Sequence, residues 1–252
     1  MLKQVMIKQG YWLFRWRSYL PLLVLPFAVE SFLNSGWMTQ QFGDFGEELW
    51  DLFCLSVALL GLSLRVLTVG FVPRGTSGRN TRRQKADTLN TTGMYSLVRH
   101  PLYLGNFLVF MGFVFLLKSG LFALLAAVIY VVYYERIILA EEEFIAERHG
   151  EEFRAWARVT PVIAPTFRNW MPPALPFSWR SVLAREFHTL FLISVVFFIS
   201  ELLEGVLIKD STAEAWIAHE PQWFALVIAS AAVYVVVRTL KKTTSWLNVA
   251  DR

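Results

Sequence analysis

Two apolar stretches decide the fold: LYLGNFLVFMGFVFLL at residues 102–117 and LFALLAAVIYVVYYERIILA at residues 121–140. Three polar or small residues, Lys118-Ser119-Gly120, separate them. A membrane-spanning helix needs about 20 predominantly apolar residues, with a minimum of about 17. The two stretches therefore predict a helical hairpin that crosses a bilayer twice.

Four further apolar runs flank this hairpin, at residues 19–33, 52–71, 190–208 and 223–237. The composition agrees with several spans, because 55% of the 252 residues are hydrophobic and only 17% are charged. Soluble domains carry about 25% charged residues. We predict an all-α, polytopic integral membrane bundle of six transmembrane helices. The first run contains Glu30 and no evident small-residue cleavage site, so we expect an uncleaved helix there.

Charge is segregated between the segments that join these runs. Residues 35–50 contain no Lys or Arg, whereas residues 73–100 are strongly basic. Positively charged loops stay in the cytoplasm. Six helices then place both termini and the segments 73–100 and 141–188 on that side. We expect an inner or plasma membrane location with a site that faces the cytoplasm. No nucleic-acid-binding module accompanies the basic residues, so a nucleic-acid partner is not expected.

The chain is predicted to form a single membrane domain over residues 1–252. Within it, residues 85–165 contain the candidate catalytic and binding residues, and residues 177–252 form a C-terminal helix pair of unassigned role. Residues 133–158 are predicted to form a helix that leaves the membrane, with a break at Gly150 and a short amphipathic helix beyond it. Prolines at 161 and 165 end the helical character.

Polar residues lie at one end of the predicted hairpin, within TTGMYSLVRHPLYLGN at residues 91–106. Pro101 suits the first position of a helix, where free N–H groups and the helix dipole attract anions. Arg99 and His100 add charge and hydrogen-bond donors there. Glu141 and Glu142 follow the second apolar stretch. Because both ends of a hairpin lie together, we expect the basic and acidic residues to meet.

A ligand that carries a carboxylate and a positive centre would suit such a place, and S-adenosylmethionine is one. Its carboxylate would meet Arg99, His100 or the helix N-terminus. Its amine or ribose hydroxyls would meet a glutamate. Its adenine and sulfonium would meet aromatic rings such as those of Tyr95 and Tyr103.

The whole pattern resembles the isoprenylcysteine carboxyl methyltransferase and phospholipid methyltransferase superfamily. The resemblance rests on Gly-x-Tyr-x-x-x-Arg-His-Pro-x-Tyr-x-Gly from Gly93, followed by Glu-Glu at 141 and Gly-Glu-Glu-aromatic at 150. It covers residues 85–165, about a third of the chain. It implies an S-adenosylmethionine site that faces the cytoplasm and a lipid-like acceptor that enters from the bilayer. The candidate cofactor residues are Leu89, Asn90, Gly93, Tyr95, Arg99, His100, Pro101, Leu102, Tyr103 and Glu141.

The expected reaction is an in-line methyl transfer, in which positioning supplies much of the catalysis. An anionic acceptor, such as a carboxylate or lipid phosphate, needs a cation to place it. Arg136, Arg154 and Arg158 are the candidates, although Arg136 lies one residue away from the family's acceptor-binding arginine. An amine acceptor, such as a phospholipid amine, would need a base, for which Glu142 is the candidate. The arginine-rich inner surface favours the anionic acceptor.

Two other classes of function remain open on the residues alone. A sterol-type membrane reductase that uses NADPH needs no Gly-x-Gly-x-x-Gly loop, which this chain lacks. A transporter or assembly factor would need no cofactor, but broken helices and repeated halves are not evident. No spacing of His, Cys or carboxylates predicts a metal site. Arg65 is expected to extend toward the cytoplasmic interface, and Glu201 and Glu204 are equally compatible with a functional role and with hydration near the outer face.

Overall fold

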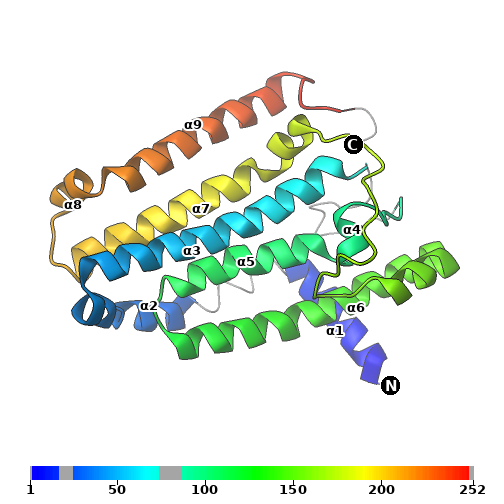
Figure 1. The fold of residues 1–252 in the computed structure, drawn as a ribbon, viewed down its shortest axis with the longest axis horizontal. Helices are drawn as coiled ribbons and strands as arrows, with labels where there is room; N and C mark the ends of the chain where they lie inside the picture. Colours follow the sequence, from blue (N-terminus) through cyan, green and yellow to red (C-terminus); the bar gives the residue numbers. More distant parts are fainter. Residues whose placement is uncertain (1, 17–24, 74–86, 250–252) are drawn as a thin grey trace.

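The computed structural model describes residues 2–16, 25–73 and 87–249, and these ranges contain helices and no strand. The helices run roughly side by side along one axis, with α3, α5, α6, α7 and α9 as the long elements (Figure 1). Their bounds are α1 Leu2–Trp16, α2 Leu25–Leu33, α3 Trp37–Phe71, α4 Met94–Leu97, α5 Pro101–Phe115, α6 Gly120–Val159, α7 Trp179–Leu207, α8 Ala213–His219 and α9 Pro221–Thr243.

Four of these helices, α3, α6, α7 and α9, are long and apolar enough to cross a membrane, and α5 is a shorter apolar helix. The predicted all-α, polytopic membrane bundle is therefore confirmed. Six crossings and cytoplasmic termini stay predictions. The predicted first span at residues 19–33 lies partly outside the described residues, and its described part forms α2.

The central hairpin is confirmed as α5 followed by α6. Ser119 begins α6 as its N-cap, and its side chain accepts a hydrogen bond from Phe122 N at 3.4 Å. Helix α6 continues for 40 residues and extends beyond the ends of the other long helices (Figure 1). Its one non-helical residue is Gly150, with φ 54°. The predicted break at Gly150 is confirmed, and the exit from the membrane stays a prediction.

The segment 37–50 was expected to be a loop between two spans and is instead the first part of α3. This helix has 35 residues with a kink at Gly43, where φ is 68°. The acidic residues of the segment do not prevent a helix, because Glu47 turns into the bundle and is only 3% exposed. Helix α7 likewise begins at residue 179, well before the apolar run at 190, because Ser178 caps it by accepting from Ser181 N at 3.2 Å.

Helices α3 and α5 pack closely through two glycines. A Cβ atom on Gly61 would lie 2.6 Å from Gly105 O and 2.7 Å from Val109 N. Small residues let helix backbones approach in this way inside a membrane, where packing rather than the hydrophobic effect drives association. This contact fixes the position of α5, whose first turn carries the predicted motif.

An ion-paired group at the end of the bundle opposite the motif ties three segments together. Lys118, in the turn between α5 and α6, has a fully buried side chain and lies 2.5 Å from both Glu47 of α3 and Glu204 of α7. Lys209 also pairs with Glu47, at 2.5 Å. Glu204 is thus buried and paired, which excludes the expectation that it is hydrated. We call Glu47, Lys118, Glu204 and Lys209 the far-end cluster.

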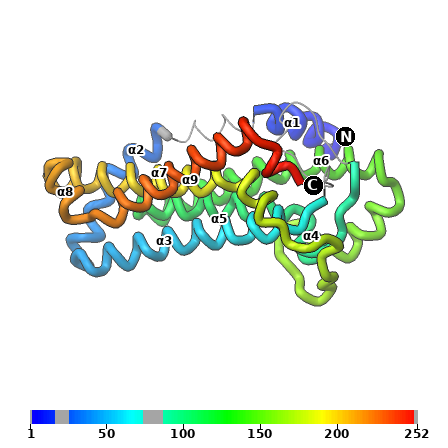
Figure 2. The backbone as a smooth tube through the Cα atoms, turned by 90° about the horizontal axis from the view of Figure 1, so that it is seen from above, coloured from blue at the N-terminus to red at the C-terminus, as the bar shows by residue number. Residues whose placement is uncertain are grey.

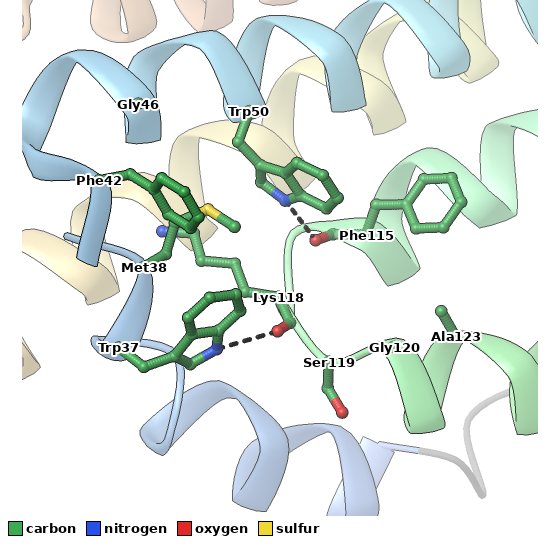
Figure 3. Close-up of a pocket in the computed structure, with 10 residues that line it drawn as sticks. All are labelled: Trp37, Met38, Phe42, Gly46, Trp50, Phe115, Lys118, Ser119, Gly120 and Ala123. Atoms are coloured by element: carbon green, nitrogen blue, oxygen red, sulfur yellow. Dashed lines mark hydrogen bonds between the residues drawn. The ribbon is translucent and has the colours of Figure 1, made fainter. Parts of the chain in front are cut away.

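A mainly apolar cavity of about 490 Å³ lies beside Lys118 (Figure 3). Two indole groups in its wall hold the turn that carries this lysine. Trp37 Nε1 donates to Lys118 O at 3.1 Å, and Trp50 Nε1 donates to Phe115 O at 2.9 Å (Figure 3). The turn is therefore fixed by backbone hydrogen bonds as well as by the ion pairs.

Substitution Lys118→Met should destabilise the fold by about 3–5 kcal/mol, because it leaves the buried Glu204 without its counter-charge and leaves Glu47 with Lys209 alone. The measurement is the unfolding transition of the detergent-solubilised protein by circular dichroism. Lys242→Met, at an exposed position in the last turn of α9, is the matched control and should shift it little. Equal transitions for both variants would contradict the role given to Lys118.

Candidate functional site

Residues 91–100, which we call the motif loop, enter α5 through a turn that begins at Gly93. This residue has φ 59°, a conformation that side-chain-bearing residues rarely adopt. Ser96 Oγ donates to Gly93 O at 2.7 Å, and Val98 N donates to Met94 O at 3.2 Å, which closes the short helix α4. The turn sets Arg99 and His100 immediately before the first turn of α5.

The structure brings the basic and acidic halves of the predicted site together. Arg99 Nη1 lies 2.9 Å from Glu142 Oε2, and His100 Nε2 lies 3.1 Å from Glu142 Oε1. His100 Nδ1 is 3.7 Å from Glu141 Oε2. These four side chains are half-buried, with exposed fractions between 10% and 27%. We call Arg99, His100, Glu141 and Glu142 the motif cluster.

An aromatic seam continues from the motif cluster into the bundle between α5 and α6. His100 stacks on Tyr103 with ring centroids 5.6 Å apart, and Tyr103 contacts Tyr134 at 4.9 Å. Tyr134 stacks on Tyr130 at 4.2 Å, and Tyr130 OH donates to Tyr103 O at 3.1 Å. Sequence reasoning missed the two tyrosines of α6. Tyr130, Tyr134 and Glu141 are spaced by four and seven residues, which places them on one face of a helix. That spacing is the sequence signal that could have identified the two tyrosines.

The remaining predicted cofactor residues lie before and within the motif loop and at the start of α5. Asn90 Oδ1 accepts from Thr92 N at 3.1 Å, and Tyr95 O accepts from Trp156 Nε1 at 3.1 Å. Pro101 is buried at the first position of α5. Leu89 and Leu102 are half-buried.

A buried ion pair lies one helical turn deeper than Tyr103. Arg65 Nε is 2.7 Å from Glu186 Oε2, and Arg65 Nη2 is 2.8 Å from Glu186 Oε1. Arg65 Nη1 also donates to Asn106 Oδ1. The expectation that Arg65 extends to the interface is therefore wrong, because its partners on α5 and α7 hold it inside. A charged residue in an apolar run predicts a buried ion pair, but the sequence does not identify which residue is the partner.

The predicted acceptor-binding arginines lie outside the motif cluster. Arg136 Nη1 donates to Val132 O at 3.0 Å and to Glu135 Oε2 at 2.6 Å. Arg154 pairs with Glu151, and Arg158 is exposed. The structure does not bring these three residues into direct contact with one another or with Glu142.

Helix α1, which the sequence analysis did not predict, crosses α6 beside Arg136. A Cβ on Gly10 would lie 2.0 Å from Arg136 O, so the two backbones nearly touch there. Lys3 Nζ pairs with Glu143 Oε2 at 2.9 Å. Burial, with smaller effects from Glu147 and Glu143, raises the pKa of Tyr11 above its ordinary value. Helix α1 thus lies against the acidic end of α6.

A segment that follows α6 covers the outer side of the motif loop. We call residues 160–178 the strap. Its backbone pairs with the loop at several points: Arg99 N donates to Pro161 O at 2.9 Å, Thr166 N to Leu97 O at 3.0 Å, and Gly93 N to Met171 O at 2.9 Å. Ser178 N donates to Gly70 O at 2.8 Å and so joins the strap to α3. The loop is therefore held in part by Thr166 and Met171, which lie outside the predicted core of 85–165.

The donor and acceptor set of the motif cluster fits a ligand that bears charges of both signs. Arg99 Nε is buried and has no hydrogen-bond partner among the described residues. Glu141 contacts His100 at a distance beyond a hydrogen bond, and its side chain is 27% exposed. In the first turn of α5, Pro101 has no N–H group and the N–H groups of Tyr103 and Leu104 both donate to His100 O, so among the described residues Leu102 N–H is left as the donor without a backbone partner. Among the described residues, no group of three or more His, Cys, Asp and Glu is arranged to hold a metal ion.

Comparison with known proteins gives two relatives of this chain. It is 32% identical over 120 residues to the nickel-cobalt-cadmium resistance protein NccN of Alcaligenes xylosoxydans xylosoxydans. It is 33% identical over 121 residues to the cobalt-zinc-cadmium resistance protein CzcN of Cupriavidus metallidurans. Each match covers 48% of this chain and 56% of the relative, so the chain spans little more than half the length of these relatives.

No solved structure matches the chain. The model of the phospholipid methyltransferase family matches residues 52–152. That range contains most of α3, the motif loop, the α5–α6 hairpin and both glutamates of the motif cluster. Residues 52–152 of this membrane protein therefore match the phospholipid methyltransferase family, which is part of the superfamily that the Arg-His-Pro and Glu-Glu motifs predicted.

Proposed function

We propose that the protein is an S-adenosylmethionine-dependent methyltransferase that methylates a lipid-like amphiphile at an anionic group, a carboxylate or a lipid phosphate. One observation carries this proposal. The motif cluster joins Arg99 and His100 to Glu142 at the end of a membrane hairpin, inside the segment that matches a methyltransferase family.

The cofactor would be held by the motif cluster and by the tyrosines of the aromatic seam that lie nearest to it. Arg99 Nε and the N–H group of Leu102 at the start of α5 would bind its carboxylate, and Glu141 would bind its amine or ribose hydroxyls. Tyr103 and Tyr134 offer ring faces to the adenine and the cationic sulfur. When bound, the cofactor supplies an activated methyl group, whose bond to sulfur breaks as a bond to the acceptor forms.

The geometry of Glu142 supports an anionic acceptor over an amine. An amine must lose a proton, so it needs a base that is free to approach the nitrogen. Both carboxylate oxygens of Glu142 are already engaged, one by Arg99 and one by His100. An anionic acceptor needs no base and requires a cation that places it. Arg136, Arg154 and Arg158 are the candidates for that role, and methylation of a phospholipid amine remains the alternative.

We further propose that the site faces the cytoplasm and that the protein resides in an inner or plasma membrane. The motif loop follows the most basic segment of the chain, and basic segments are retained in the cytoplasm. The names of the two relatives describe metal resistance in those proteins and specify no reaction. They therefore do not decide the acceptor.

Calorimetric titration of the detergent-purified protein should detect binding of S-adenosylmethionine and S-adenosylhomocysteine. His100→Ala and Glu141→Ala should each weaken it about 10-fold or more, because a charge-assisted hydrogen bond contributes about 1.5–3 kcal/mol. Glu151→Ala removes an exposed carboxylate from the same helix and serves as the matched control.

The same titration includes NADPH, which tests the reductase alternative. Binding of NADPH by folded protein, without binding of either adenosyl ligand, would overturn the methyltransferase. Equal affinities in all three variants would exclude the motif cluster as the cofactor site.

Arg136→Ala should raise the KM for the acceptor about 10-fold and change kcat less, because it removes a cation that would bind the acceptor anion. The assay follows a labelled methyl group from S-adenosylmethionine into a prenylated cysteine, phosphatidic acid or phosphatidylethanolamine. Arg238→Ala, at an exposed position of α9, is the control. Methylation of phosphatidylethanolamine alone would contradict the anionic acceptor, and an unchanged KM would remove Arg136 from the site.

A further inference from the structure

The strap exposes apolar side chains in a short stretch. The exposed fractions are 55% for Ile163, 78% for Phe167, 48% for Trp170 and 51% for Met171. Large apolar groups clustered in this way on a protein surface mark a contact with another molecule or a membrane. We call these four residues the strap tip.

The strap tip has a defined shape. Trp170 N donates to Phe167 O at 3.3 Å, which makes a turn between the two aromatic residues. Asn169 Nδ2 donates to Val159 O at 3.1 Å and ties this turn back to the end of α6. The apolar side chains are therefore presented by a held loop.

The strap projects sideways from the bundle at the level where the long helices end. Figure 2 shows it on one flank, beyond α4, with α1 on the opposite flank at the same level along the helix axes. Helix α1 also exposes aromatic and basic side chains. Trp12 and Trp16 are 56% and 44% exposed, and Lys8 is exposed on the same helix. Aromatic and basic residues concentrate at the boundary between lipid and water.

The charges around the strap tip complement an anionic lipid surface. Arg168 lies between Phe167 and Trp170, and Arg158 precedes the strap at the end of α6. Neither arginine forms an ion pair with any described residue. Phe177 at the other end of the strap packs on Phe71 of α3, so the strap continues from a spanning helix.

We propose that the strap tip inserts into the headgroup region of the adjacent membrane leaflet, with Arg158 and Arg168 in contact with anionic lipid headgroups. Apolar and aromatic groups bind this region by entering it to a depth of about 5–10 Å. Because the strap backbone is hydrogen-bonded to Gly93, Leu97 and Arg99, the lipid contact fixes the outer wall of the motif loop. This inference does not depend on the identity of cofactor or acceptor.

The test measures the depth of a nitroxide label in the full chain reconstituted in nanodiscs with phosphatidylglycerol. The natural cysteine, Cys54, is buried and is replaced by alanine in all samples. Phe167→Cys and Trp170→Cys carry the label in two separate samples. Glu152→Cys, on the exposed part of α6, is the water-side control, and Leu125→Cys, at an exposed apolar position of α6, is the lipid-side control.

Labels at 167 and 170 should collide with a water-soluble nickel complex several-fold less often than the label at 152, and should be accessible to oxygen as the label at 125 is. Two labelled sites guard against a variant that fails to fold, and thermal unfolding checks each sample. Nickel accessibility equal to that at 152 would overturn the lipid contact. Shielding from both reagents would indicate burial against a second copy of the chain and would overturn it as well. Either failure leaves the proposed reaction untouched.

Discussion

A bilayer supplies no water to a charged side chain, so Arg65 and Lys118 are stabilised within this bundle by partners on other segments, and those pairs set its geometry. Arg65 of α3 is held by Glu186 of α7 and Asn106 of α5. At the other end, Lys118 holds Glu47 and Glu204. The two groups bracket the close contact of α3 with α5. They thereby fix where the first turn of α5 presents its motif, since that turn can shift only if buried pairs separate.

Sequence reasoning predicted the parts of the structure that depend on local pattern. The length and polarity of residues 102–140 determine a hairpin, and a hairpin must bring Arg99 and His100 to the same end as Glu142. It failed where the outcome depends on partners distant in sequence. The residues next to Arg65 in the sequence are equally compatible with a side chain that reaches the interface and with one that pairs with Glu186. The acidic residues before position 50 predict a loop, because the sequence alone does not show that Lys118 and Lys209 neutralise Glu47.

The position of Arg136 illustrates how a helix face limits a role inferred from spacing. Arg136 and Glu143 lie seven residues apart, which places them on one face of α6. That face meets α1, as the contacts of Gly10 and Lys3 show. Tyr130, Tyr134 and Glu141 occupy the face that meets α5. An acceptor held by Arg136 would therefore approach the motif cluster from the flank covered by α1, whereas one held by Arg158 would approach from the strap.

The family match ends at residue 152, yet the motif loop is held by residues beyond it. The strap supplies hydrogen-bond acceptors to the N–H groups of Gly93 and Arg99, which sit at points where the loop has no partner within its own turn. A loop that binds ligand through backbone and side-chain groups must be rigid to do so at low entropic cost. The C-terminal part of this chain is therefore more than a membrane anchor, because α7 carries Glu186 under the aromatic seam and the strap forms the outer wall of the loop.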